Sequence, residues 1–348
     1  MTLRNGFPED LARYSRQMLL SRIGVEGQRR LSQSRVLVVG IGALGSTLAA
    51  FLVRAGVGFV RLVDRDFIEL DNLQRQTLFD EQDIAAGLPK AIAAAEKLRR
   101  ANSAVTVEPI VADVTAANVE RFVEGCNLAL DGSDNFEVRL LLNDACLKGR
   151  VPWVYGAAIG TTGSTMTFVP GDGPCFRCLV PDIPAPGTVP TCETAGVLAT
   201  VPQVVASLQA TEAIKLLCGH GEDLVRQMRF LDLWAGTVES LEIRKGSERC
   251  PACDDGRYEY LEGGRGSGSA TMCGRTAVQV DPGPVGAPDF GTLSERLALV
   301  GEVSFNRYML KFKSSGKELV LFRDGRAIIK GTSDVTAARA MYARYVGA

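Results

Sequence analysis

The first strong pattern along the chain is a short, unbroken apolar run at residues 35–40, RVLVVG, which ends in glycine. A run of this length, rich in β-branched residues, is typical of a strand buried on both faces of a sheet. Residues 43–56 then place apolar side chains at helical spacing, and residues 59–66 form a second apolar run that ends in acidic side chains. This order predicts a strand–helix–strand unit of about 30 residues.

The turn between the first strand and the helix carries the spacing G-x-G-x-x-G, at Gly40, Gly42 and Gly45. The first two glycines allow a tight turn and a close approach to a phosphate, and the third allows the helix to pack on the strand. Asp64 follows at the distance along the chain at which an acid meets a ribose hydroxyl. The turn therefore predicts a nucleotide site. The acid at Asp64 fits NAD and ATP equally, whereas the glycine turn taken alone favours an NAD-dependent oxidoreductase.

Strands and helices continue to alternate through the first 150 or so residues, which indicates a mainly parallel doubly wound sheet. The apolar patterns predict further helices at 89–102, 118–125, 136–150 and 197–219, and strands at 105–114, 126–135, 151–170 and 228–245. The last two ranges read as antiparallel strands. We therefore expect an α/β fold, a Rossmann-like doubly wound and mainly parallel sheet with an antiparallel extension.

Residues 261–275, LEGGRGSGSATMCGR, change the composition to Gly and Ser, which is typical of a flexible linker. The linker divides the chain into an expected nucleotide-binding domain at 1–260 and a small α+β domain at 276–348. The Asp-Gly pair in RDGR, at 323–326, predicts a hairpin in the small domain.

Composition then narrows the function. The 348 residues have a formal net charge of −1, so no overall field favours nucleic acid or an anionic membrane. No apolar run reaches the ~18 residues of a membrane-spanning helix and the N-terminus lacks a signal-peptide pattern, so we expect a cytoplasmic protein. Nine cysteines in a reducing compartment favour metal ligation or thiol chemistry over disulfides. His220 is the one histidine, which excludes a zinc site built from three imidazoles.

Polar residues near the glycine turn favour a triphosphate over a nicotinamide. Arg16, Arg75 and Lys90 are candidates to neutralise phosphates, although solvated surface charges are the usual alternative. Asp131 and Asp134 follow a predicted parallel strand, at the sheet edge where ligands bind. A carboxylate there can hold Mg²⁺, which prefers oxygen ligands and phosphates.

The chain resembles the MoeB/ThiF family, the bacterial relatives of ubiquitin-activating enzymes. The matching stretches span about residues 8–255 in the family's order and are highly specific as a set. They are RYSRQ, VVGIGALGS, LVDRDFIELDNLQRQTLF, PK at 89–90, LDGSDN, VPWVYGAAIGTTGSTMTF, PCFRC, TCETAGVLA, SLQATEAIKLL and CPAC. The resemblance implies an adenylyltransferase that uses ATP and magnesium to activate the C-terminal glycine of a small ubiquitin-like sulfur carrier ending in Gly-Gly.

The resemblance also implies roles for single residues. Asp64 matches the ribose-binding acid, and Arg16 matches an arginine that reaches the neighbouring subunit's ATP site, which implies a homodimer. The other expected nucleotide ligands lie in the same stretches; they are Asp66, Asn72, Arg75, Gln76, Lys90, Asp134 and Asn135, with Asp134 also expected to handle magnesium. Attack by an ionised carboxylate needs no general base, so electrostatic clamping can supply the catalysis.

Eight of the nine cysteines divide into three groups, and the ninth, Cys273, lies in the predicted linker. Cys175, Cys178, Cys250 and Cys253 form two C-x-x-C pairs that can make a closed, tetrahedral zinc site; the alternative is four reduced thiols. Cys192 matches the family's conditional thiol; the alternative is a small apolar residue beside the zinc module. The third group, expected in the core, is Cys126, Cys146 and Cys218.

Several alternatives stay open on sequence alone. The substrate can be a peptide or another carboxylate, the protein can be an NAD-dependent oxidoreductase, and a scaffold with a degenerate nucleotide site is a third reading. A sulfurtransferase or a cysteine desulfurase is a possible further partner. The small domain, too short for a rhodanese, can dock the carrier, mediate oligomerisation or be a plain appendage.

Overall fold

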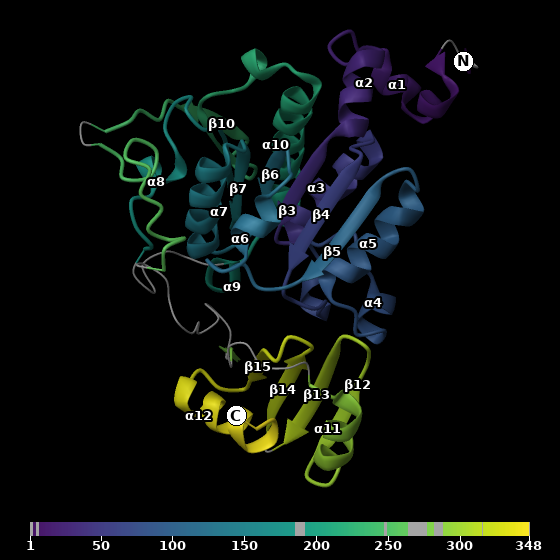
Figure 1. Cartoon of the computed structure of the whole chain (residues 1–348), viewed down its shortest axis with the longest axis vertical. Helices are drawn as coiled ribbons and strands as arrows, with labels where there is room; N and C mark the ends of the chain where they lie inside the picture. The colour runs from purple at the N-terminus through teal and green to yellow at the C-terminus, as the bar shows by residue number, and fades with distance from the viewer. Residues whose placement is uncertain are drawn as a thin grey trace. The chain divides into compact units, whose positions relative to one another are not determined.

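The computed structural model describes residues 3–4, 7–184, 192–246, 249–263, 277–281, 288–314 and 316–347. By its internal packing the chain divides into two compact units (Figure 1). The larger comprises Met1–Pro190 and Ala195–Arg265, and the smaller comprises Thr191–Thr194 and Gly266–Ala348. Most of the predicted linker at 261–275 lies outside the described residues.

An eight-stranded sheet forms the centre of the larger unit. Its strands are β3 (Arg35–Val39), β4 (Phe59–Asp64), β5 (Thr106–Val111), β6 (Leu128–Asp131), β7 (Trp153–Ile159), β8 (Thr162–Phe168), β9 (Met228–Asp232) and β10 (Thr237–Leu241). The spatial order is β10-β9-β8-β7-β6-β3-β4-β5. The strands from β5 to β7 are parallel, and β8, β9 and β10 continue the sheet antiparallel. The predicted doubly wound sheet with an antiparallel extension is confirmed.

Helices cover both faces of this sheet, so each strand's side chains enter one of two apolar cores. One core packs the sheet against α2 (Gly24–Gln33), α3 (Ala43–Ala55), α5 (Lys90–Ala101) and α10 (Thr200–Cys218). The other packs it against α6 (Val119–Val123), α7 (Phe136–Gly149) and α8 (Phe176–Leu179). The shorter elements of the chain are β1 (Leu3–Arg4), β2 (Phe7–Pro8), η1 (Glu9–Tyr14), α1 (Ser15–Met18), η2 (Leu70–Asn72), α4 (Glu81–Ala85), α9 (Cys192–Ala195) and η3 (Gly221–Asp223).

The smaller unit has a five-stranded antiparallel sheet in the order β11-β15-β14-β13-β12. Its elements are β11 (Ala277–Val280), α11 (Phe290–Leu297), β12 (Glu302–Phe305), β13 (Met309–Ser314), β14 (Lys317–Phe322), β15 (Ala327–Lys330) and α12 (Val335–Tyr345). One core joins α11 and α12 to a face of this sheet. The predicted hairpin lies between β14 and β15, where Gly325 has a φ of 87°. The expected α+β fold is confirmed.

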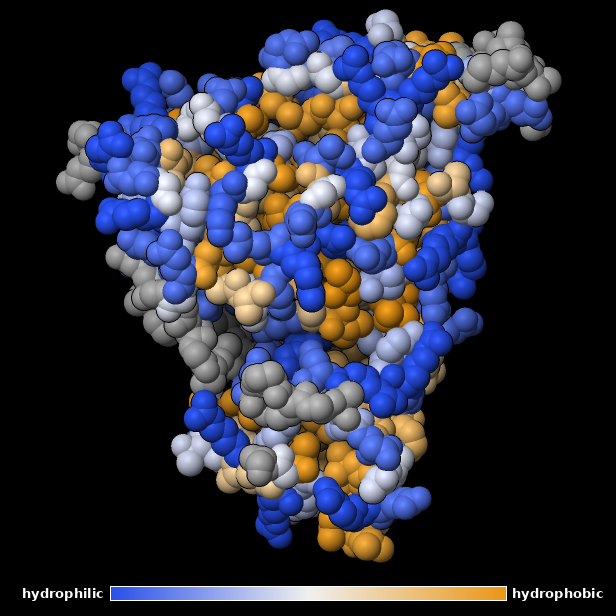
Figure 2. All heavy atoms as spheres, in the orientation of Figure 1, coloured by the Kyte–Doolittle hydropathy of each residue, from blue (hydrophilic) through white to orange (hydrophobic). Residues whose placement is uncertain are grey.

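The surface of the larger unit mixes polar and apolar side chains. On the face drawn in Figure 2, apolar residues show in several places among hydrophilic ones. The most exposed apolar side chain of the antiparallel extension is Trp234, at 80%. No helix among the described residues combines the length and the apolar character that crossing a bilayer requires.

Candidate active site

The candidate site lies at the switch point of the sheet, between β3 and β6, where the order of the strands reverses. Gly40 follows β3 and Gly132 follows β6, so both lie at the carboxyl edge where parallel sheets bind ligands. The Gly40 N–H donates to the Val63 carbonyl at 2.8 Å, and the Gly132 N–H donates to the Val39 carbonyl at 2.7 Å. Three neighbouring strands therefore fix the backbone of the turn.

Three glycines pack against one another at this turn, and a side chain on any of them would collide with the backbone. A Cβ atom on Gly45 would lie 1.7 Å from the Gly40 carbonyl oxygen, and one on Gly132 would lie 2.6 Å from the same oxygen. Gly40 also has a φ of 81°, a left-handed conformation that glycine adopts most easily. The spacing predicted Gly40 and Gly45, whereas Gly132 was missed; its only signal was its place directly after a strand-ending acid.

Gly42 differs from these three because it faces open space. It precedes the first residue of α3, and a Cβ atom there would meet only the Gln76 amide nitrogen, at 3.9 Å. Gln76 is 3% exposed, and its Oε1 has no hydrogen-bond partner among the described residues. A buried acceptor without a donor costs free energy unless a ligand or water satisfies it. The space and the free amide oxygen both fit a bound nucleotide at the start of α3.

Two acids and a lysine lie at the end of β4. The Asp64 carboxylate accepts from the backbone N–H groups of Ile41, at 2.5 Å, and Asp66, at 2.7 Å. Burial raises the pKa of Asp64, while the charge of Lys90 opposes that shift. Lys90, the first residue of α5, is 4% exposed and its Nζ lies 3.3 Å from the Asp66 carboxylate. The structure thus brings all three predicted residues to the edge that holds the glycine turn.

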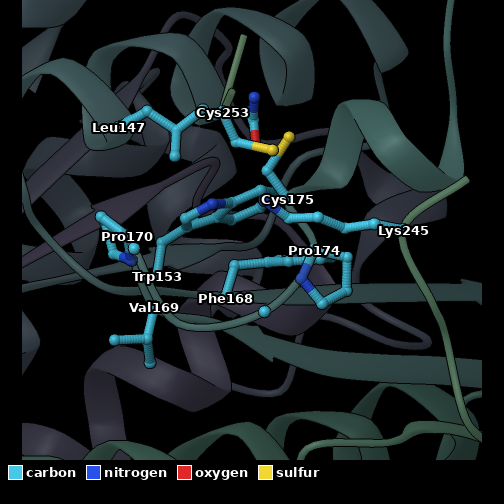
Figure 3. Close-up of a pocket in the computed structure, with 12 residues that line it drawn as sticks. Leu147, Trp153, Phe168, Val169, Pro170, Pro174, Cys175, Lys245 and Cys253 are labelled. Atoms are coloured by element: carbon cyan, nitrogen blue, oxygen red, sulfur yellow. The ribbon is translucent and has the colours of Figure 1, made fainter. Parts of the chain in front are cut away.

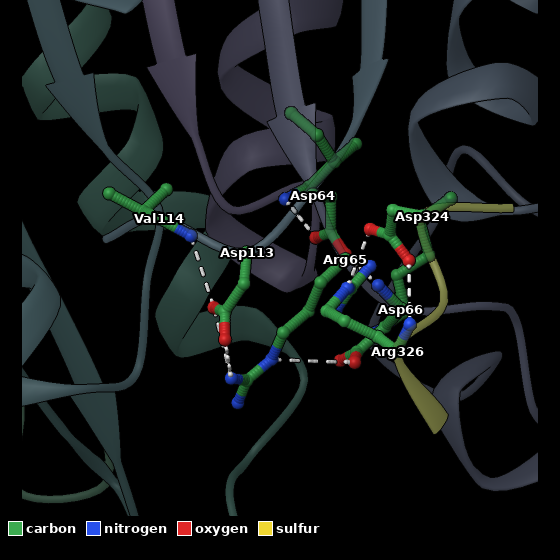
Figure 4. A network of polar contacts seen from close by, with 9 residues as sticks. Asp64, Arg65, Asp66, Asp113, Val114, Asp324 and Arg326 are labelled. Atoms are coloured by element: carbon green, nitrogen blue, oxygen red, sulfur yellow. Dashed lines mark hydrogen bonds and ion pairs between the residues drawn. The ribbon is translucent and has the colours of Figure 1, made fainter. Parts of the chain in front are cut away.

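Arg65 lies between these two acids, and the sequence did not single it out. It joins the end of β4 to Asp113, in the segment that follows β5 (Figure 4). Its guanidinium donates to both carboxylate oxygens of Asp113, each at 3.1 Å, and lies 3.8 Å from Asp66. Burial lowers the pKa of Arg65, but the negative charges of Asp113, Asp66 and Asp134 raise it further than burial lowers it. Asp134 therefore lies within electrostatic reach of this group.

Asn72 is the last residue of η2, and Arg75 lies in the turn that follows it. Asn72 is fully buried; its side chain accepts from the Glu69 N–H at 3.3 Å and donates to Asp71 at 2.8 Å. Arg75 is half-buried and donates to the Asp71 carbonyl at 2.7 Å. Asn72 thus has a structural function in the turn, while Arg75 keeps donors for an anion.

The loop after β6 separates its two aspartates. Asp131 is fully buried, accepts from Arg139 at 2.9 Å and accepts from the Ser133 hydroxyl at 2.6 Å. Asp134 is exposed and makes no hydrogen bond or ion pair with the described residues. Asn135 caps α7 by accepting from the Glu137 N–H at 2.8 Å. Of the acids in this loop, Asp134 is therefore the one free to bind a cation.

Arg16 is the predicted residue that the structure does not bring to this group. Its neighbour Gln17 donates to the carbonyl of Ala55, at the end of α3 away from the glycine turn. The 13 residues of α3 span about 20 Å, so Arg16 is anchored far from its own chain's turn. Its expected action on a neighbouring subunit stays a prediction.

A second cluster contains four thiols from two distant segments. The sulfur atoms of Cys175, Cys178, Cys250 and Cys253 all lie within 4.8 Å of one another. Three of the S···S distances are 3.9, 3.8 and 3.7 Å. Tetrahedral zinc with Zn–S bonds of about 2.3 Å requires S···S distances of about 3.8 Å. The geometry therefore fits a four-thiolate zinc site with no open position.

Residues of α7 connect the two halves of the thiol cluster. Asn143 accepts from the Phe176 N–H at 2.9 Å, and the neighbouring Asp144 accepts from the Tyr260 N–H at 3.2 Å. Both α7 residues are fully buried, and burial raises the pKa of Asp144 to about 6. A small pocket next to the cluster is lined by Trp153, Phe168, Pro174 and Lys245 among others (Figure 3).

The other cysteines take different positions. Cys126, Cys146 and Cys218 are buried in the two cores of the larger unit, as predicted. Cys192 begins the four-residue helix α9, and its side chain lies outside the described part of the chain.

A glycine turn and free polar groups at the switch point of a doubly wound sheet define a nucleotide-binding type of α/β protein, here with a four-thiol module. The chain belongs to the ThiF family, whose model matches residues 14–252. The family resemblance read from the sequence is thereby confirmed.

Two relatives illustrate this membership. The chain is 41% identical to the sulfur carrier protein ThiS adenylyltransferase of Bacillus subtilis (strain 168) over 339 residues, which cover 96% of this chain and 99% of the relative. It is 45% identical to the SAMP-activating enzyme E1 of Haloferax volcanii over 252 residues, which cover 72% of this chain and 92% of that protein. The first alignment is long enough to include the smaller unit.

Solved structures confirm the fold. A crystal structure of E. coli MccB with MccA-N7isoASN has a TM-score of 0.62 at 23% identity and covers 71% of this chain and 76% of that one. At that identity the likeness concerns the architecture of the chain.

Proposed function

We propose that this protein uses ATP and magnesium to adenylate the C-terminal glycine of a small ubiquitin-like sulfur carrier. The similarity to the Bacillus subtilis ThiS adenylyltransferase, over nearly the whole length of both chains, is the single observation that carries the proposal. The candidate site supports it, because the space at Gly42 and the free Gln76 oxygen fit a nucleotide.

The residues of the site would act by binding and orienting the nucleotide. The N–H groups at the start of α3 would bind phosphate oxygens, and Asp64 would bind the ribose. Arg75 and Lys90 would neutralise the phosphates, with Asp66, Asn72 and Asn135 shaping the pocket around them. Magnesium held by Asp134 would stabilise the charge of the leaving pyrophosphate.

The carrier's terminal carboxylate is already ionised near neutral pH, so no general base is required. Its oxygen would attack the α-phosphorus, forming the acyl-phosphate bond as the bond to pyrophosphate breaks. Catalysis would then come from alignment and charge stabilisation. This requirement agrees with a site that offers arginine, lysine and carboxylate side chains.

The four-cysteine cluster would hold a structural zinc ion. Zinc there would fasten the segment after β8 to the segment after β10 and would take no part in the reaction, because all four ligands are protein thiolates.

A homodimer, with Arg16 serving the partner's ATP site, and a covalent intermediate on Cys192 complete the proposal. A sulfurtransferase or a cysteine desulfurase would supply sulfur to the activated carrier. The smaller unit would dock the carrier or the second subunit.

Intact-mass analysis tests the proposal. The protein is incubated with Mg–ATP and a candidate carrier, and the matched control is the same carrier without its terminal Gly-Gly. We expect adenylate formation on the complete carrier alone, and a covalent enzyme–carrier adduct that Cys192→Ala loses. Modification of an unrelated peptide instead of any carrier would support the alternative that the enzyme activates peptides.

A further inference from the structure

Gln203, in the first turns of α10, hydrogen bonds to two of the segments that build the candidate phosphate site. Its Nε2 donates to the Arg75 carbonyl at 2.9 Å, and its Oε1 accepts from the Thr47 hydroxyl at 2.5 Å. Thr47 lies in α3, one turn beyond the start of the helix. A single side chain therefore joins α10, α3 and the turn that carries Arg75.

The carbonyl that Gln203 holds belongs to the peptide unit between Arg75 and Gln76. The Arg75 side chain lies on the N-terminal side of this unit, and the Gln76 side chain lies on its C-terminal side. The Gln76 amide nitrogen would be 3.9 Å from a Cβ atom placed on Gly42. Rotation of this peptide unit would move both side chains. The backbone N–H groups of Arg75 and Gln76 share the Asn72 carbonyl, at 3.1 and 2.9 Å, so Gln203 supplies the restraint on the opposite side of the unit.

The helix that carries Gln203 is well suited to act as a fixed support. α10 runs for 19 residues and packs on α3, β7 and β8. Val201 and Val205, on either side of Gln203, are fully buried. Gln203 itself is half-buried, and its amide both donates and accepts, which neither a carboxylate nor an apolar side chain of the same length can do.

We propose that Gln203 is a positioning residue for ATP: it fixes the Arg75–Gln76 peptide unit so that both side chains face the nucleotide. This inference rests on the proposed function, because Arg75 and Gln76 contact a nucleotide only if the glycine turn binds ATP. Gln203 does not touch the nucleotide and acts through the two residues that do.

The test measures the affinity for Mg–ATP by calorimetry in the full-length chain without any carrier. Gln203→Met keeps the length of the side chain and removes both hydrogen bonds, while Gln203→Glu keeps the acceptor for Thr47 and loses the donor to Arg75. We expect each variant to bind ATP about tenfold more weakly, as loss of one positioned hydrogen bond predicts. Gln203→Glu carries the test should Gln203→Met fail to fold.

Two controls separate positioning from general damage. Ser207→Ala removes an exposed hydroxyl that bonds the Gln203 backbone carbonyl at 2.8 Å, and Thr47→Ser keeps the hydroxyl that faces Gln203. Both should bind ATP as the unchanged protein does, and urea unfolding checks that every variant is folded.

The two proposals fail in distinguishable ways. Folded Gln203→Met and Gln203→Glu that bind Mg–ATP as tightly as the unchanged protein would overturn the inference and leave the proposed function standing. Absence of binding by the unchanged protein itself would overturn both.

Discussion

At the carboxyl edge of the sheet, some acidic side chains are held by hydrogen bonds and ion pairs within the protein, and others have no such partner among the described residues. Asp131 is engaged by Arg139 and Ser133, whereas Asp134, three residues later, is exposed and free within the described residues. The sequence could not separate the two acids, because the difference comes from Arg139 on the following helix. The family resemblance singled out Asp134 by position, and its role with magnesium stays a prediction.

Asp144 gives a residue-scale prediction on pH. Its folded pKa of about 6 lies above the usual unfolded value of about 3.9, so the folded state binds the proton more tightly. The resulting stability is fully present below the unfolded pKa and is lost as pH rises through the folded pKa. Asp144→Asn cannot ionise, so its free energy of unfolding lacks this dependence on pH. Between about pH 5 and pH 8, the difference in free energy of unfolding should therefore shift by about 1.4 kcal/mol in favour of Asp144→Asn.

Urea unfolding of the two proteins at a series of pH values measures this difference. A gap between the two free energies of unfolding that stays constant with pH would show that Asp144 does not titrate in this range.

At the scale of elements, the strand, turn and helix around Gly40 could be predicted because each depends on local sequence. The apolar run, the glycine spacing and the helical periodicity all lie within residues 35–66. The contribution of Gly132 could not be predicted, because its close approach to Gly40 and Gly45 exists only once β6 lies beside β3. Gln203 was missed for the same reason, since its partners are far from it in the chain.

Replacement by alanine should lower stability at one glycine of the turn and ATP affinity at another. Gly45→Ala places a Cβ atom 1.7 Å from the Gly40 carbonyl oxygen, so α3 must move and the protein should lose several kcal/mol of stability. Gly42→Ala meets nothing nearer than 3.9 Å, so its stability should change by only about 1 kcal/mol. The new methyl group would nevertheless occupy the space that we propose for a phosphate, and ATP binding should weaken more than tenfold.

Urea unfolding and calorimetric titration with Mg–ATP measure both quantities in each variant. Unchanged ATP affinity in Gly42→Ala would exclude a phosphate at that position.

At the scale of the whole molecule, the four thiols join segments that are 75 residues apart in the sequence. The two C-x-x-C pairs could be recognised from sequence, and their meeting depends on the antiparallel extension, which returns the chain to the end of β8. The sequence also predicted the smaller unit as a separate α+β fold. Its role could not be predicted, because its elements carry no motif that specifies chemistry.

Two cysteines with similar burial, one inside the thiol cluster and one outside it, allow a controlled test of the zinc prediction. Cys250 is 8% exposed within the cluster and Cys126 is 7% exposed outside it, so replacement by alanine removes a similarly buried thiol in each case. We expect one zinc per chain in the unchanged protein and in Cys126→Ala, measured by elemental analysis. Cys250→Ala should lose the metal and unfold at lower urea, because the bound ion stabilises the folded state.

Zinc retained at full occupancy in Cys250→Ala would contradict the four-thiolate site. Chelation of the unchanged protein that leaves its unfolding curve in place would show that the ion has no structural function.

The central claim is that this chain joins AMP to a carrier's C-terminal glycine, and ATP–pyrophosphate exchange tests it most directly. We predict that exchange needs magnesium and a carrier ending in Gly-Gly, and that Asp134→Ala abolishes it while the protein stays folded. The absence of carrier-dependent exchange in folded, metal-loaded protein would contradict the proposed activity. Undiminished exchange in Asp134→Ala would contradict the role of Asp134.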